Sequence, residues 1–69
     1  MIAYIYVSYS QLTDSFFRRS IEQACGKEPS VHFEDNLCFY RVKVNNEQLI
    51  GLIEDNYILK TAAKIILYH

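Results

Sequence analysis

The chain has 69 residues, a net charge of −1 and a pI near 6.0, which allows one small domain and sets up no strong positive field for avid duplex binding. Apolar residues make up 51% of the sequence while Gly and Pro are rare, a composition that excludes a disordered chain. No apolar stretch reaches the length of a membrane span and no signal peptide is recognisable, so we expect a single cytoplasmic domain over residues 1–69.

The first predicted element is a strand over residues 2–9, because its side chains alternate in character with a period of two. One face is small and apolar and consists of Ala3, Ile5 and Val7. The other face carries Ile2, Tyr4, Tyr6 and Ser8. We expect the small apolar face to pack against helices, which leaves the tyrosines on the opposite side of the sheet.

A helix follows the polar cluster SQLTDS. Ser10 and Thr13 are candidate N-caps, and Asp14 would lie in the first turn. Apolar side chains then recur at helical spacing up to Cys25, and Gly26 stands where a helix commonly ends. The sequence therefore predicts an amphipathic helix that stops at Gly26.

Two strands are predicted next, SVHFED and NLCFYRVKV, joined around Asp35–Asn36, a pair suited to a tight turn. In the second strand one face consists of Cys38, Tyr40, Val42 and Val44. The opposite face consists of Leu37, Phe39, Arg41 and Lys43. Because Arg and Lys seldom stay buried without a partner, we expect this second face to be in contact with water.

The last third of the chain allows two interpretations. In the preferred one residues 49–54 form a strand and residues 57–69 a helix, because an Ala-rich apolar stripe recurs at helical spacing from Ile58 to Ile66. In the other, Asn45 caps a helix over residues 46–54, with Gln48 as in a capping box, and KIILYH is a strand.

Both interpretations predict an α+β fold: a two-layer, open-faced sandwich in which one antiparallel sheet has two helices on one face. The preferred order is β-α-β-β-β-α, and the alternative is the ferredoxin-like split β-α-β-β-α-β. In both orders the second face of the sheet carries no helix.

No pattern of residues points to catalysis or to metal binding. His32 and His69 are the only histidines, and no metal-ligand spacing or glycine-rich phosphate loop occurs. We expect Cys25 and Cys38 to be reduced, buried side chains and not a catalytic Cys–His pair with His32. We therefore expect no enzyme, no cofactor, no metal and no small-molecule substrate.

The bare face of the sheet is the candidate binding site. It would gather Tyr4, Tyr6, Phe39, Arg41 and Lys43 if the first and third strands are neighbours. Exposed aromatic patches commonly mark interaction sites, and Tyr and Arg are enriched in interfaces. We expect a non-enzymatic domain that acts by occupancy, as an inhibitor or adaptor, and that associates with a protein or with itself as a homodimer. Self-association would use this face or an unpaired edge strand.

The alternative function is binding of single-stranded or structured RNA or DNA through the same face. The strands IYVSYS and LCFYRVKV are similar to the two strand motifs of RNA-recognition motifs, without the glycines of the second motif. Residues 14–69 in the preferred order resemble double-stranded-RNA-binding domains, without the lysine cluster of that family. VSYSQLTDSFFRRSIEQ resembles the opening of the small ferredoxin-like nucleases of CRISPR adaptation, but Ser10 stands where that family carries a metal-binding Asp. These are fold-level resemblances and imply no function.

Overall fold

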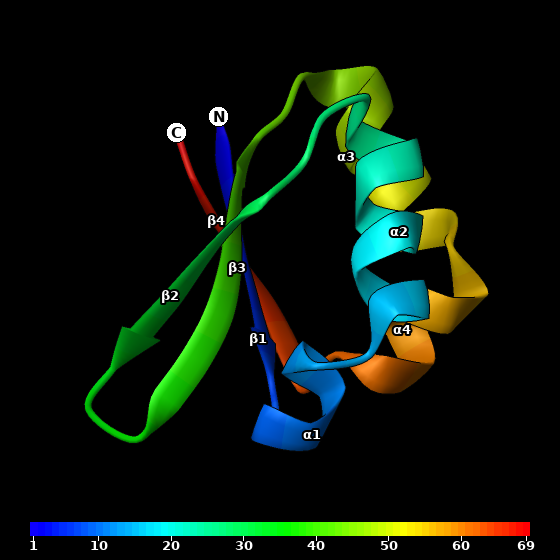
Figure 1. Ribbon diagram of the computed structural model, residues 1–69. Coiled ribbons are helices and arrows are strands. Elements are labelled where there is room, and N and C mark those ends of the chain that lie inside the picture. Colours follow the sequence, from blue (N-terminus) through cyan, green and yellow to red (C-terminus); the bar gives the residue numbers. More distant parts are fainter.

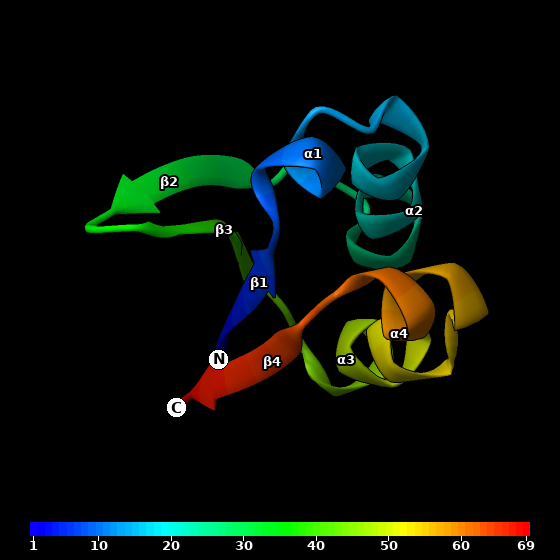
Figure 2. The same cartoon turned by 90° about the horizontal axis from the view of Figure 1, so that it is seen from below.

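Two layers make up the structure, a computed structural model that describes residues 1–69 (Figure 1). The elements in chain order are β1 (Ile2–Val7), α1 (Tyr9–Leu12), α2 (Ser15–Cys25), β2 (Ser30–Glu34), β3 (Leu37–Lys43), α3 (Asn46–Glu54), α4 (Asn56–Thr61) and β4 (Lys64–Tyr68). The strands form one antiparallel sheet in the order β2-β3-β1-β4, and the helices lie on one side of it (Figures 1 and 2). The predicted α+β sandwich with one bare face is confirmed. None of the helices is long and apolar enough to span a membrane.

The preferred order for the last third of the chain was wrong, and the ferredoxin-like alternative is the one observed. Asn45 and Gln48 form a reciprocal capping box. The Asn45 side-chain oxygen accepts from the backbone N–H of Gln48 at 2.8 Å, and the Gln48 side-chain oxygen accepts from the backbone N–H of Asn45 at 2.9 Å. This box starts α3 where a strand was preferred. The Ala-rich stripe forms only the short helix α4, because Ala62 is extended (ψ 137°) and β4 follows.

The resemblance to double-stranded-RNA-binding domains is also wrong for this fold, because it requires a C-terminal helix where the structure has the strand β4. The tail of the chain instead pairs with β1 at the far edge of the sheet.

The polar cluster after β1 contains two helix starts and not one. Ser8, not Ser10, caps the short helix α1, and Thr13 ends that helix. Asp14 is the N-cap of α2, where its side chain accepts from the Phe16 amide at 2.9 Å. At the other end of α2, Gly26 is left-handed (φ 72°), as predicted from its position. The predicted turn is also confirmed, with Asp35 left-handed (φ 54°).

The core lies between the sheet and the helices. It is built from the helix-facing rows of β1 and β3 and from α2, α3 and α4, namely Ala3, Ile5, Val7, Phe17, Ile21, Cys25, Cys38, Tyr40, Val42, Val44, Leu52 and Ile58. Tyr40 is fully buried, and its hydroxyl donates to the Leu12 carbonyl at 2.8 Å, so its one polar atom is satisfied. Both cysteines are unpaired and buried, as expected, and burial raises the pKa of the Cys25 thiol to about 11.

A hydrogen bond across the helix layer joins α4 to the start of α2. The Tyr57 hydroxyl donates to the Asp14 carboxylate, and the Tyr57 ring packs near Phe17 with 6.3 Å between the ring centroids. This hydrogen bond is the main cause that lowers the pKa of Asp14 below its ordinary value of 3.8, and it raises the pKa of Tyr57. One carboxylate thus caps α2 and tethers α4.

Replacing Tyr57 with Phe removes the donor and keeps the ring. Because the pKa of Asp14 is lower in the folded state, the hydrogen bond stabilises the fold above pH 3.8 and this contribution is lost as the pH falls through the folded-state pKa. We expect Tyr57→Phe to lower the urea midpoint of unfolding at neutral pH. The difference in midpoint between the variant and the wild type should become smaller in acid. Tyr9→Phe is the control, since Tyr9 is 71% exposed. A difference in urea midpoint between Tyr57→Phe and the wild type that stays constant with pH would contradict the role of Asp14.

Candidate functional site

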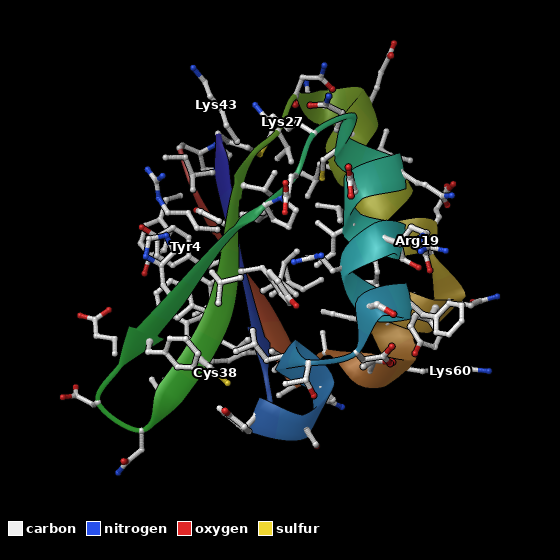
Figure 3. All side chains as sticks on the ribbon, viewed as in Figure 1. Tyr4, Arg19, Lys27, Cys38, Lys43 and Lys60 are labelled. Atoms are coloured by element: carbon white, nitrogen blue, oxygen red, sulfur yellow. The ribbon has the colours of Figure 1, made fainter.

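The bare face of the sheet brings the five predicted site residues together. The register of β1 and β3 places Tyr4 opposite Arg41, Tyr6 opposite Phe39 and Ile2 opposite Lys43. Ala3, Ile5 and Val7 between them are buried under the helices, so alternation along β1 directs both tyrosines to the other side. Figure 3 shows Tyr4 on the side of the sheet away from the helices that carry Arg19 and Lys60.

Three rings lie one behind another across β2, β3 and β1. Phe39 and Tyr4 are stacked with centroids 5.2 Å apart and an interplanar angle of 10°. His32 and Phe39 are stacked at 5.4 Å and 14°. Because β3 lies between β1 and β2, the two neighbours cover opposite faces of the Phe39 ring. Phe39 was expected to face water, but it is only 4% exposed: the adjacent rings bury it on the side of the sheet that has no helix.

Tyr6 and Tyr68 extend this cluster toward β4. The Tyr6 ring lies 5.1 Å from Phe39, and the Lys64 Nζ lies 4.9 Å from the centroid of the Tyr6 ring, a cation–π contact. Tyr68 packs on Tyr4 with 4.8 Å between centroids. Burial is the main cause that raises the pKa of Tyr6, with smaller contributions from neighbouring phenols and a carboxylate. The rings therefore hold one another in place.

Sequence reasoning missed three members of this surface: His32, Lys64 and Tyr68. The preferred interpretation placed the last two in a helix, and the alternative made KIILYH a strand without assigning either residue to the candidate site. The alternation within KIILY was the signal that could have found them, because Lys64, Ile66 and Tyr68 fall on one face of a strand. His32 was predicted only as a residue of the strand SVHFED, and nothing local in the sequence indicates its stack on Phe39.

The acidic residues are unevenly distributed over the molecule and are rare on the bare face of the sheet. The bare face carries the exposed cations Arg41, Lys43 and Lys64 and a single carboxylate, Glu34. The other acidic residues lie on helices, caps and turns and are Asp14, Glu22, Glu28, Asp35, Glu47, Glu54 and Asp55. A chain with a net charge of −1 thus presents a positively charged sheet face. We call the surface formed by Tyr4, Tyr6, His32, Phe39, Arg41, Lys43, Lys64 and Tyr68 the aromatic–basic face.

The aromatic–basic face consists of aromatic rings and cations. No group of three His, Cys, Asp or Glu side chains is placed to hold a metal ion. Cys25 lies in the core while His32 lies on the opposite side of the sheet, so they do not form a Cys–His pair. The His32 Nε2 is instead 2.9 Å from the Ser30 hydroxyl. What the face provides is immobilised rings with cations around them.

Phe39 should stabilise the fold as a core residue does. We expect Phe39→Ala to lower the free energy of unfolding by about 3–5 kcal/mol, the range observed when a buried Phe is replaced by Ala. Phe16→Ala is the matched control, since Phe16 is 67% exposed, and it should change stability by less than about 0.5 kcal/mol. Urea unfolding followed by circular dichroism measures both. Equal losses in the two variants would contradict a buried Phe39.

Comparisons of the chain with protein-family models, with curated proteins and with solved structures gave no significant match. The functional inference therefore rests on the fold and on the aromatic–basic face.

Proposed function

We propose that this chain is a non-enzymatic binding domain that acts by occupancy, as an inhibitor or adaptor, and that the aromatic–basic face contacts a protein partner. The observation that carries the proposal is the cluster of stacked rings on the face without helices, with Arg41, Lys43 and Lys64 around it. A clustered aromatic surface of this kind is a feature of interaction sites on soluble proteins.

The stacked rings favour binding because they are already ordered. An interface that must immobilise flexible side chains loses about 0.5–1.5 kcal/mol for each of them. Here Phe39 fixes Tyr4 and Tyr6 by direct ring contacts before any partner arrives. Tyr and Arg are also the residues that most often contribute large shares of binding energy. We therefore assign the affinity to Tyr4 and Tyr6, and the orientation to Arg41 and Lys43.

Charge indicates an acidic partner surface. The three cations of the face would oppose three more if two copies met face to face, and like charges across an interface are unfavourable. An acidic protein surface removes this repulsion and accelerates encounter. Self-association is therefore better placed at an edge of the sheet than on this face.

Single-stranded nucleic acid is the second candidate, and the three cations are the observation that favours it. Base stacking requires an accessible ring face. Phe39 is covered on both sides, Lys64 lies over Tyr6, and Tyr68 packs on Tyr4. Ring edges and hydroxyls are what remain for a partner, and they suit a protein surface better than a stack of bases.

The test compares a face variant with a control on the helix side. We expect Tyr6→Ala to fold normally and to weaken binding by about 1–3 kcal/mol. Arg41→Glu should weaken it further, whereas Arg19→Glu, on the helix layer, should bind like the wild type. Each variant is immobilised and exposed to the same host extract, with and without nuclease treatment, and its circular dichroism spectrum is recorded.

A bound protein that survives nuclease and is lost only from the face variants supports the proposal. Equal retention by Arg41→Glu and the wild type would contradict it. Salt-sensitive retention of short single-stranded oligonucleotides on filters, lost in Arg41→Glu, would replace it with the nucleic-acid function. Unfolding of Tyr6→Ala would show that Tyr6 serves the fold and not a partner.

A further inference from the structure

The β4 strand forms an edge of the sheet and carries only one of the features that usually protect edges, a single lysine at its start, Lys64. It pairs with β1 on one side only (Figure 2). Its middle residues are Ile65, Ile66 and Leu67, with no proline and no acidic residue in the strand. Monomeric proteins blunt such edges with charges, prolines or bulges, because unpaired backbone groups recruit another strand.

The opposite edge, β2, is protected in the expected way. Pro29 precedes it, and Ser30, His32 and Glu34 occupy alternate positions along it. The two edges of one sheet thus differ in character: β2 is polar on one of its faces, and β4 is apolar through its centre. This asymmetry makes β4 the edge suited to pairing.

An apolar groove adjoins the β4 edge on the helix side. Its volume is about 350 Å³, and its walls come from α3, α4, β4 and the Ala62–Ala63 link between the last two, with Leu49, Ile53, Leu59 and Ile65 among the apolar side chains. In its walls Ile53 and Leu59 are each about half exposed. The helices therefore leave the β4 end of the core incompletely covered, and an element beside β4 would complete it.

We propose that a second copy of this chain occupies this edge: β4 pairs antiparallel with β4 of the second copy about a two-fold axis at Ile66. Pairing centred there sets Ile66 opposite itself, Ile65 opposite Leu67, and Lys64 opposite Tyr68 of the second copy. Ile65 and Leu67 face the helices in both copies, so the second copy extends the apolar layer over the groove.

The charges of β4 favour this arrangement over others. Lys64 is the only charged group in the strand and in the groove, and antiparallel pairing places it beside a tyrosine ring. The same contact already exists within the chain, where Lys64 lies over Tyr6. Parallel pairing in register would instead oppose the two Lys64 side chains, which is unfavourable. The strand is thus self-complementary in the antiparallel sense.

The result is a continuous sheet of eight strands, four from each copy, with the helices of both copies on one side. Both aromatic–basic faces lie on the other side, where the contact between the copies involves only Lys64 and Tyr68 of each face. The dimer does not rest on the proposed function, because its contacts leave Tyr4, Tyr6 and Arg41 free.

A cysteine at Ile66 tests the register directly. In the proposed dimer the two residues 66 have Cα atoms about 4.5–5.5 Å apart, within disulfide range. We expect Ile66→Cys to form a covalent dimer under mild oxidation, while His32→Cys, at the centre of the other edge strand, stays monomeric. The buried native cysteines do not compete. Crosslinking of His32→Cys in preference to Ile66→Cys would overturn the proposal.

Analytical ultracentrifugation of the purified, unsubstituted chain tests the assembly without a crosslink. We expect a dimer whose dissociation constant rises about 100-fold in Ile53→Lys, since two cations would then line the contact. Phe33→Lys is the control: Phe33 is 64% exposed and lies on β2. A wild-type monomer at all concentrations, or a dimer unaffected by Ile53→Lys, would overturn the proposal. If Ile53→Lys fails to fold, the Ile66→Cys crosslink decides, and neither test substitutes Tyr4, Tyr6 or Arg41, to which the proposed function assigns partner binding.

Discussion

The antiparallel pairing of β1 with β3 is the constraint on which both sides of the molecule depend. It joins the two interior strands in one register, so the same set of backbone hydrogen bonds positions two unrelated surfaces. On the helix side it sets Ile5 beside Tyr40, and Tyr40 then reaches the α1 carbonyl of Leu12. On the other side it sets Tyr6 beside Phe39. A slip of one residue would exchange the two faces and expose the core.

Local signals predicted those parts of the fold that local chemistry decides. Gly26 ends α2 because it adopts a left-handed conformation, and the Asp35 turn reverses the chain in the same way. The last third could not be resolved from its own periodicity, because Ala62 fits a helical stripe as well as a strand entry. What decides it is the pairing of β4 with β1, more than fifty residues away in the sequence. Tertiary pairing overrides helix propensity here, and the Asn45 capping box was the better local guide.

The candidate site was predicted in outline and not in its contacts. Alternation along two strands suffices to place Tyr4, Tyr6 and Arg41 on one face, and the structure confirms that placement. The burial of Phe39 could not be predicted from the sequence, because it arises from rings on three strands and not from a helix layer. Net charge was also a poor guide. It averages over a molecule whose acidic residues lie mostly on helices and turns, while Lys64 and its neighbours make the sheet face basic.

The burial of Phe39 has a consequence for how this surface can evolve. Under the proposed function the Phe39 ring supports both the sheet and the contact surface, so a substitution at Phe39 would alter stability and partner choice together. Arg41 and Lys43 are exposed and lie outside the ring stack, so they can vary with little loss of stability. Descendants of this sequence would then diversify their partners through the charged rim while the rings stay unchanged.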